Sequence, residues 1–293
     1  MIGVSGVTRT VQMGFEELLE RMTPVNSDSV RAEKNLRIIE SCLKADFNMS
    51  YLATYGSTSH GTSIKDHSDV DCFVVIPKSR LFESVEQSIS ALQDSLTQYL
   101  SNATITQGRP TLAIPFGKAT GERHQIIPAY PSGEKGGHEF YGVPAPSDRW
   151  INVSPGAHSA WIGKINDDLG KNFKPFIRLI KAWNCYNDSP LWSYYIELCV
   201  AEFLSGESSI VYSMDIKNFF NFMVEKNLEP IEGAAGSDDL VYGTSIATKE
   251  EARIKLALAA EQAAQAHKCE IKGDIADAFH LWRKLFNWQY PAY

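Results

Sequence analysis

Two aspartates, Asp69 and Asp71, stand two residues apart in a short apolar stretch of the sequence. The stretch predicts a β-strand, and side chains at positions i and i+2 of a strand point to the same face. The two carboxylates are therefore neighbours, and they repel each other unless a positive charge lies between them. Hard oxygen ligands suit Mg²⁺ or Mn²⁺, so the pair predicts a site for a divalent metal.

A Gly-Ser turn, Gly56-Ser57, precedes this strand and follows the apolar run 51–55. Such a turn exposes backbone N–H groups and a hydroxyl, which are suitable donors for a phosphate. A polar loop that ends with Gly61-Thr62 connects the turn to the strand. Turn, loop and aspartates together predict a site for a metal-bound nucleoside triphosphate.

The order of Gly56-Ser57, Gly61-Thr62 and Ser68-Asp69-Val70-Asp71 resembles the signature of the DNA-polymerase-β-type nucleotidyltransferases. Within that superfamily the chain most resembles the bacterial cGAS/DncV-like nucleotidyltransferases. Those are relatives of cyclic GMP-AMP synthase and oligoadenylate synthetase, and they make cyclic oligonucleotide signals in anti-phage defence. The resemblance covers nearly the whole chain, because further runs follow in the order of the family, at 150–155, 173–183, 191–198 and 282–291.

The resemblance implies that Asp69 and Asp71 bind two divalent metal ions, which activate the attacking hydroxyl and hold the triphosphate. It also implies that the Gly56 backbone and the Ser57 side chain contact the phosphates. His60 lies in the same loop and could contact a phosphate, whereas His158 shows no metal-binding spacing with any cysteine or carboxylate.

The third carboxylate of the family is replaced in this chain. Its place is three residues before the proline of a Pro-Ala turn, and Gln125 stands there, ahead of Pro128. Glutamine is a neutral, weaker metal ligand and a poor base. Glu122 is three positions away and His124 one position away, so both face away from Gln125 in a regular strand. A β-bulge could turn Glu122 back toward the site.

Three explanations of Gln125 stay open from the sequence. The enzyme could run on two carboxylates, with water or phosphate removing the proton of the substrate hydroxyl. The protein could be a degenerate member of the family that binds nucleotides without turnover. Gln125 could also be an engineered replacement of a glutamate that traps a substrate complex.

The resemblance assigns a phosphate contact to Lys181, which lies within the apolar helix predicted over 173–187. In this interpretation the ammonium reaches the β- and γ-phosphates. The alternative is a surface lysine whose stem lies along apolar neighbours while its charge stays in water. Arg109, Lys118 and Arg123 could line the acceptor side of the site.

Ser193 and Tyr194 follow in the next predicted helix. By resemblance, Ser193 binds the terminal phosphate and Tyr194 stacks on the base. Base stacking on a tyrosine tolerates different bases. Tyr195 is the rival for this role, because one step along a helix changes the face.

Apolar periodicity predicts the elements that position these residues. Helices are predicted over 10–22, 27–46, 81–100, 158–169, 173–187, 191–204, 214–226, 249–267 and 275–286. Besides the strand of the two aspartates, strands are predicted over 103–107, 111–116 and 123–127, and the many Gly and Pro of 131–155 predict a loop. The pattern is α+β with a mixed sheet. With the resemblance it predicts a polymerase-β-like palm lobe over 1–155, including the N-terminal helices, and a helical lobe over 156–293 that closes the nucleotide cleft.

A net charge of −7 argues against a protein whose main task is to grip long nucleic acid, but it allows a nucleotide. No apolar segment has the length of a membrane span, and no signal sequence opens the chain. Five scattered cysteines without a CxxC motif are expected to be reduced thiols. These properties predict a cytoplasmic protein without a membrane partner.

The expected function is Mg²⁺-dependent synthesis of a cyclic di- or trinucleotide second messenger from NTPs such as ATP and GTP, in bacterial anti-phage defence. Mn²⁺ is the alternative metal, and a regulatory protein partner is compatible with this interpretation. One alternative is a nucleotide-binding or sensing protein of the same fold without turnover. Another is a transferase that adds nucleotides to RNA or to a protein.

Overall fold

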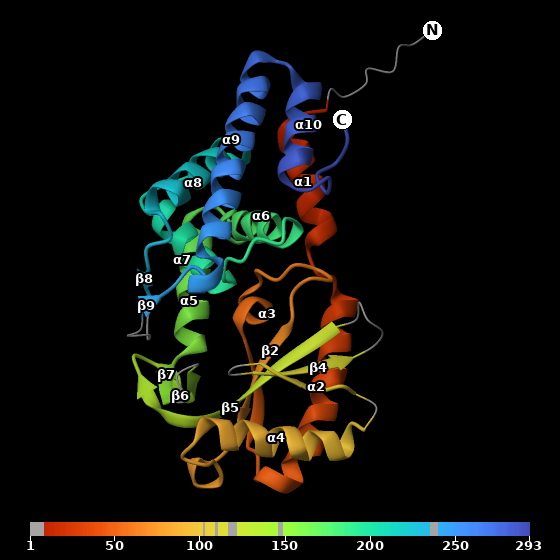
Figure 1. Ribbon diagram of the computed structural model, residues 1–293, viewed down its shortest axis with the longest axis vertical. Helices are drawn as coiled ribbons and strands as arrows, with labels where there is room; N and C mark the ends of the chain where they lie inside the picture. Colours follow the sequence, from red (N-terminus) through yellow and green to blue (C-terminus); the bar gives the residue numbers. More distant parts are fainter. Residues whose placement is uncertain (1–8, 102, 109–110, 117–121, 146–148, 235–239) are drawn as a thin grey trace. The chain divides into compact units, whose positions relative to one another are not determined.

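The computed structural model describes residues 9–101, 103–108, 111–116, 122–145, 149–234 and 240–293 (Figure 1). The chain divides into two compact units. The sheet unit comprises the described residues of Pro24–Lys164 and Ala234–Asp238, and the helical unit comprises those of Met1–Thr23, Ile165–Gly233 and Asp239–Tyr293.

The sheet unit holds a mixed sheet with the strand path β1-β2-β5-β4-β3, to which β6 and β7 are added beside the second half of β5. Its strands are β1 (Tyr51–Tyr55), β2 (Val70–Val75), β3 (Thr106–Gln107), β4 (Leu112–Phe116), β5 (Glu122–Lys135), β6 (His138–Ala145) and β7 (Arg149–Val153). Its helices are α2 (Asn26–Phe47), α3 (Gly56–His60), η1 (Lys78–Arg80), α4 (Val85–Tyr99) and most of α5 (Pro155–Asp168). β2 runs parallel to β5, whereas β1–β2 and β4–β5 are antiparallel. The α+β class with a mixed sheet is confirmed.

Alternate residues of β2 pack into two separate cores. Cys72 and Val74 belong to the core that the sheet forms with α2 and α4, whereas Phe73 and Val75 face the core on the other side, with Tyr141 of β6. All five side chains are buried. The sheet is therefore covered on both faces along β2, and the face of Phe73 is also the face of Asp71, two residues earlier.

The loop predicted over 131–155 is wrong, because this segment completes β5 and forms β6 and β7. Its glycines have specific tasks in the strands. Gly133 (φ +138°) lies at a shift of register between β5 and β6, and Gly136 and Gly137 have positive φ in the hairpin turn. A Cβ on Gly142 would lie 2.2 Å from Cζ of Tyr130. Glycines that usually indicate a loop therefore mark a bulge, a turn and a close contact in this hairpin.

Other predicted elements differ mainly at their ends. The strand predicted over 103–107 is reduced to β3, and the helix predicted over 81–100 begins at Val85, after Ser84. The hydroxyl of Ser84 accepts a hydrogen bond from the backbone N–H of Gln87, which explains where α4 begins.

The helical unit is built from helices that precede and follow the sheet unit in the sequence. They are α1 (Val11–Met22), the end of α5, α6 (Phe173–Tyr186), α7 (Ser193–Phe203), α8 (Tyr212–Lys226), η2 (Ile246–Thr248), α9 (Lys249–Lys272) and α10 (Ile275–Leu285), with a short pair of strands, β8 (Ile231–Glu232) and β9 (Leu240–Val241).

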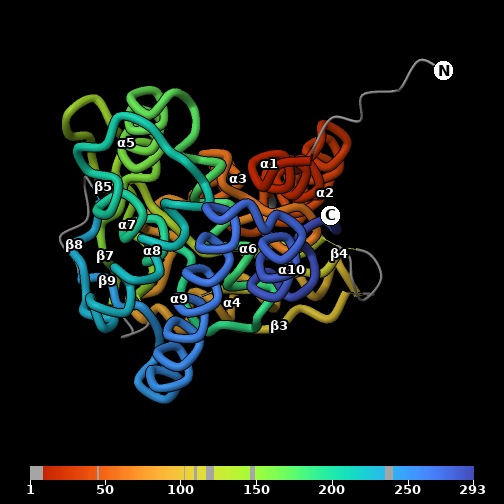
Figure 2. The backbone as a smooth tube through the Cα atoms, turned by 90° about the horizontal axis from the view of Figure 1, so that it is seen from above, coloured from red at the N-terminus to blue at the C-terminus, as the bar shows by residue number. Residues whose placement is uncertain are grey.

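An aromatic core holds the N-terminal helix α1 in the helical unit. The ring of Phe15 lies 5.0 Å from the rings of Trp282 and Tyr290 and 6.1 Å from that of Phe286, measured between centroids. Figures 1 and 2 both show α1 beside α10. Aromatic edge contacts of this kind add to the burial of large apolar side chains, so α1 packs with the end of the chain.

The observed units therefore differ in two respects from the predicted lobes, which were divided at residue 155. The first helix groups with the helical unit, and α5 continues from the sheet unit into the helical unit at Ile165.

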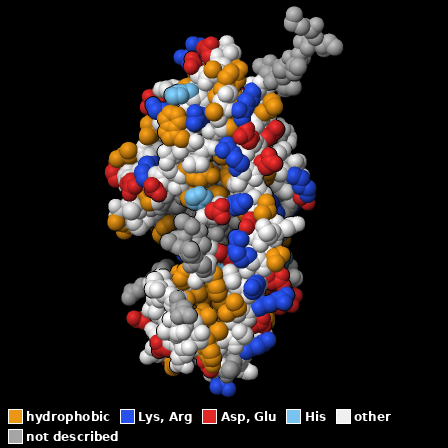
Figure 3. All heavy atoms as spheres, turned by 90° about the vertical axis from the view of Figure 1, so that its right-hand side faces the viewer, with side chains coloured by type: hydrophobic (Ala, Val, Ile, Leu, Met, Phe, Trp, Pro, Cys, Tyr) orange, Lys and Arg blue, Asp and Glu red, His pale blue; other side chains and the backbone are white. Residues whose placement is uncertain are grey.

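Charged side chains of both signs are intermixed on the face drawn in Figure 3. Ion pairs between oppositely charged residues of one helix include Arg37 with Glu33 on α2 and Lys255 with Glu251 on α9. None of the described helices combines the length and the apolar composition that crossing a membrane requires.

Candidate nucleotide and metal site

Gly56-Ser57 begins the five-residue helix α3 instead of forming an open turn. Gly61 ends this helix in the left-handed region (φ +76°), and its backbone N–H donates to the carbonyl of Ser57. The N–H of Thr62 donates to the same carbonyl at 2.9 Å. The glycine pair of the signature therefore stands at the two ends of one helical turn, between β1 and the loop that leads to β2.

Gly56 lies directly against the carboxylate of Asp71. A Cβ on Gly56 would be 2.7 Å from Oδ2 of Asp71, and the backbone of Gly56 has φ +67°. In the sheet, the Cα of Asp71 is paired with that of Tyr55 on β1. Glycine is therefore required here for two reasons: the left-handed backbone and the space that the carboxylate occupies.

The two aspartates share one face of the sheet unit, as the alternation predicts. Asp71 lies in β2, and Asp69 directly precedes the strand. Val70 and Cys72 between and after them are buried. The loop before Asp69 is closed by Ser68, whose hydroxyl accepts a hydrogen bond from the N–H of Ile64 at 2.8 Å.

Asp69 receives hydrogen bonds from two side chains of the neighbouring strand β5. Nε of Arg123 donates to Oδ1 at 2.8 Å, and Nη2 of the same guanidinium donates to Oδ2 at 2.9 Å. Nε2 of Gln125 also donates to Oδ2. The hydrogen bond to Asp69 raises the pKa of Arg123 above its ordinary value. Arg123 thus supplies the positive charge that adjacent carboxylates need.

Gln125 occupies the position beside the aspartates where the third acid was expected. Its Cα is paired with that of Asp71 across the parallel strands. Because a carboxylate only accepts hydrogen bonds, the amide nitrogen of Gln125 must point toward Asp69. The side chain is therefore a neutral hydrogen-bond donor at the position of the expected third acid.

Glu122 and His124 face away from the aspartates, and no bulge turns them back. Glu122 accepts hydrogen bonds from Arg31 and Asn35 of α2, at 3.0 and 2.9 Å. The ring of His124 is fully buried, with Nε2 at 3.2 Å from Oε1 of Glu122. Burial lowers the pKa of His124, against the opposing effect of Glu122. The acid nearest to Gln125 in sequence therefore anchors α2.

The donor set fits a hard divalent cation. It offers two carboxylates on one face, with a side-chain amide next to them, and oxygen ligands of this kind suit Mg²⁺ or Mn²⁺. The ion pair of Arg123 with Asp69 shows that the electrostatic potential beside the aspartates favours a cation. Arg109 and Lys118, also considered for the acceptor side, lie outside the described residues.

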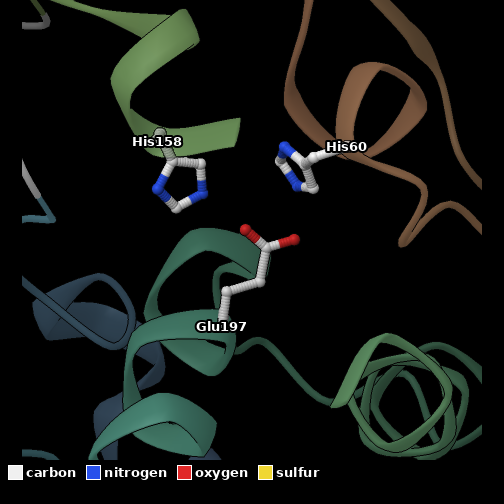
Figure 4. A group of neighbouring side chains, drawn as sticks. All are labelled: His60, His158 and Glu197. Carbon is white, nitrogen blue, oxygen red and sulfur yellow. The ribbon is translucent and has the colours of Figure 1, made fainter. Parts of the chain in front are cut away.

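His60 and His158 form a contact that the sequence did not indicate (Figure 4). His60 ends α3 and His158 lies on α5, and their ring centroids are 5.0 Å apart in an edge-to-face arrangement. His60 is buried, and the ring of Trp161 lies 5.6 Å from that of His158. The two histidines are far apart in the sequence, so no local spacing could have revealed the pair.

Lys181 of α6 forms a buried ion pair with Glu197 of α7, within the helical unit. The two residues are only 5% and 3% exposed, and Nζ of Lys181 donates to Oε1 of Glu197. The alternative of a surface lysine is therefore wrong. Removing one partner of such a pair leaves a buried charge without compensation, at a cost of about 3–5 kcal/mol.

Ser193 and Tyr194 lie at the start of α7, where Ser193 is exposed and Tyr194 is half-buried. Tyr195 is fully buried, and its hydroxyl donates to the carbonyl of Glu229 at 2.8 Å. A Cβ on Gly243 would lie 2.9 Å from the ring of Tyr195. Tyr195 is therefore a core residue, and Tyr194 remains as the candidate for base stacking.

Comparison with solved structures finds the same fold in bacterial nucleotidyltransferases. The CD-NTase CdnG of Bradyrhizobium diazoefficiens, solved in complex with GTP, has a TM-score of 0.72 at 12% identity, over 97% of this chain and 96% of that chain. CdnC of E. coli MS115-1, solved with ATP, has a TM-score of 0.71 at 17% identity, over 96% and 99%. Vibrio cholerae DncV, a cyclic AMP-GMP synthase solved with a linear intermediate, has a TM-score of 0.66 at 12% identity, over 96% and 88%.

No protein-family model and no curated protein matches the sequence. At the identities above, the likeness establishes the fold, and the chain has the α+β fold of the cGAS/DncV-like nucleotidyltransferases. The fold expected from the signature is therefore confirmed.

Replacing Gly56 tests the contact with Asp71, with Gly137→Ala as the matched control. Both glycines have positive φ, +67° and +77°, but nothing lies within 4 Å of a Cβ on Gly137. The backbone cost of about 1–2 kcal/mol applies to both changes. Gly56→Ala should lose a further 1–3 kcal/mol or so because its methyl group overlaps the carboxylate. Urea denaturation measures both free energies of unfolding, and equal losses would contradict the contact.

Proposed function

We propose that the chain binds a metal-bound nucleoside triphosphate at Asp69 and Asp71 and joins nucleotides into a cyclic di- or trinucleotide. The observation that carries the proposal is the pair of carboxylates on one face of the sheet, held between Gly56 and Gln125, in a chain with the CD-NTase fold. Mg²⁺ is the metal of choice, and Mn²⁺ has the same ligand preference.

Each residue of the site has a distinct task in this proposal. Asp69 and Asp71 hold the metal, which supplies charge stabilisation at the reacting α-phosphate when bound. Gly56 leaves space for the carboxylate of Asp71, and Ser57 contacts the phosphates. Lys181 and Ser193 supply further phosphate contacts, and Tyr194 stacks on the base.

The transfer forms a bond between a ribose hydroxyl oxygen and the α-phosphorus, and it breaks the bond to pyrophosphate. The proton of the hydroxyl must leave during this step. Gln125 cannot accept it, because an amide is not a base near neutral pH. In this chain the proton passes to water or to a phosphate oxygen, and we expect turnover to be slower than with an acid at position 125.

The substrates and the regulation proposed here follow the solved structures that share the fold. CdnC is solved with ATP and in complex with a HORMA protein, CdnG with GTP, and DncV is a cyclic AMP-GMP synthase. By analogy, we propose ATP and GTP as substrates, a regulatory protein as a partner, and a signalling role in anti-phage defence.

One observation favours a second candidate function, a nucleotide sensor without turnover. The third seat of the site holds the neutral Gln125, and Arg123 already pairs with Asp69. The neutral amide leaves the site without a base for the proton of a ribose hydroxyl, whereas both aspartates remain as metal ligands. The net charge of −7 gives no support to a transferase that acts on long RNA.

Product analysis separates these functions. The wild-type chain is incubated with all four NTPs and Mg²⁺, and then with Mn²⁺, and the products are identified by mass spectrometry. We expect a cyclic di- or trinucleotide together with pyrophosphate, and no product from Asp71→Asn. Gln125→Glu should increase the rate, because it restores a base.

The control for this assay is Arg37→Gln, which removes an exposed charge on α2 and should leave the rate unchanged. Binding of Mg-NTP without pyrophosphate release would support the sensor instead. Product formation by Asp71→Asn at the wild-type rate would refute the assignment of the metal site.

Replacing Tyr194 tests the stacking contact. Tyr194→Ala should weaken NTP binding about 5- to 150-fold, since stacking of a base on an aromatic ring contributes roughly 1–3 kcal/mol. Tyr194→Phe keeps the ring and should bind like the wild type. Tyr242, another tyrosine of the helical unit, is 54% exposed, so Tyr242→Ala is a suitable control. Calorimetry measures all four affinities, and an unchanged affinity of Tyr194→Ala would assign this tyrosine a purely structural role.

A further inference from the structure

The carboxylate of Asp69 has little capacity left for metal ligation. A carboxylate offers about four lone-pair sites, two on each oxygen. Arg123 uses one on Oδ1 and one on Oδ2, and Gln125 uses the second on Oδ2. Counting the donors among the described residues, one site remains, on Oδ1. Asp69 in this arrangement can bind one metal ion, but it cannot bridge two ions with one oxygen on each.

The formal charge of the site leads to the same limit. Asp69 and Asp71 bring two negative charges, Arg123 brings one positive charge, and Gln125 is neutral, so the sum is −1. An acid at position 125 without Arg123 would give −3. The triphosphate neutralises the ion that accompanies it, so a second divalent ion must be balanced by the acids of the protein, and a sum of −1 does this less well than −3.

The two metal seats of a nucleotidyl transfer site differ in how they depend on the protein. The ion that accompanies the triphosphate receives several oxygen ligands from the phosphates themselves, as is usual for Mg²⁺. The ion that activates the hydroxyl depends on carboxylates of the protein. The loss of one carboxylate therefore affects the second seat more than the first.

We propose that this site holds one divalent cation, the one that accompanies the triphosphate, and that the guanidinium of Arg123 replaces the second. Arg123 is then a positioning residue: it orients Asp69 through two hydrogen bonds and neutralises it where the second ion would otherwise lie. The inference rests on the proposed function, because it requires that a metal-nucleotide binds to Asp69 and Asp71.

The geometry of Arg123 suits this role better than that of a lysine would. Its planar fork donates to both oxygens of Asp69, which fixes the plane of the carboxylate. The side chain of Arg123 is 58% exposed and that of Asp69 is 16% exposed. The pair lies at the edge of the site, so Arg123 can be replaced without opening a cavity in the core.

The number of Mn²⁺ ions bound per chain tests the proposal without a measurement of turnover. The protein is mixed with one equivalent of α,β-methylene ATP, or of the matching GTP analogue, and titrated with Mn²⁺. Equilibrium dialysis, in which unbound analogue and its Mn²⁺ distribute equally across the membrane, gives the number of ions held by the chain at saturation. We expect one Mn²⁺ for the wild-type chain and two for the double variant Arg123→Gln/Gln125→Glu.

A single variant provides a second test in case the double variant does not fold. Arg123→Gln should bind the first Mn²⁺ about tenfold more tightly, because it removes a positive charge a few ångströms from a divalent ion. Arg123→Lys keeps the charge and should bind Mn²⁺ like the wild type. Arg37 pairs with Glu33 on the exposed side of α2, so Arg37→Gln controls for the change in net charge and should leave both the number and the affinity unchanged.

The outcomes separate this inference from the proposed function. Two Mn²⁺ ions on the wild-type chain, or a single ion on the folded double variant, would overturn the inference and leave the proposed function standing. No Mn²⁺ retained by the wild-type chain with either analogue would overturn both. An affinity of Arg123→Gln equal to that of the wild type would show that Arg123 does not oppose the metal.

Discussion

Repulsion between the carboxylates of Asp69 and Asp71 is the constraint on which the site depends. Two negative charges on one face of a strand need a cation, and the register of the sheet provides one from the protein itself. β5 runs parallel to β2 with His124 opposite Val70 and Gln125 opposite Asp71. This register brings Arg123 to the level of Asp69, so the strand that was expected to supply a third acid supplies a guanidinium and an amide.

The same alternation that brings Arg123 and Gln125 to the aspartates sends Glu122 and His124 to the other face. There Glu122 has a structural role, because it binds Arg31 and Asn35 of α2. The acid nearest to Gln125 in the sequence thereby holds a helix on the sheet. In the proposed function, the consequence of this exchange is a site that has two carboxylates for a metal-nucleotide but no base at position 125 to remove a proton.

Lys181, which is proposed to contact phosphate, forms a second charged pair, with Glu197 of the helical unit. The ammonium is buried and held by a carboxylate. Glu197 accepts a hydrogen bond from this ammonium, and in the proposed function a phosphate is a further acceptor. A buried ion pair is often no more stable than apolar residues of similar volume. Binding of an anion would be a functional reason for the chain to retain this pair.

Short-range patterns in the sequence were sufficient for the parts of the site that depend on strand alternation. The shared face of Asp69 and Asp71 and the opposite direction of Glu122 follow from a period of two residues. The segment 131–155 could not be predicted in this way, because a glycine in a bulge or hairpin has the same sequence signal as a glycine in a loop. Long-range contacts were also out of reach.

Two such contacts change the picture of the molecule. Phe15 assigns the first helix to the helical unit through aromatic residues near the end of the chain. His60 meets His158 from a distant helix. Neither contact has a local periodicity, so only the folded chain reveals it. The ion pair of Arg123 with Asp69 is also a long-range contact. It joins two strands, so predicting it requires the register of the sheet.

The dependence of nucleotide affinity on Mg²⁺ tests the central claim most directly. Calorimetry with ATP and with GTP is carried out on the wild-type chain and on Asp69→Asn, first with Mg²⁺ and then with EDTA in its place. The account predicts that at least one nucleotide binds the wild-type chain much more tightly with Mg²⁺, and that Asp69→Asn loses this difference. Equal affinities with Mg²⁺ and EDTA for the wild-type chain would contradict a metal-nucleotide site at Asp69 and Asp71.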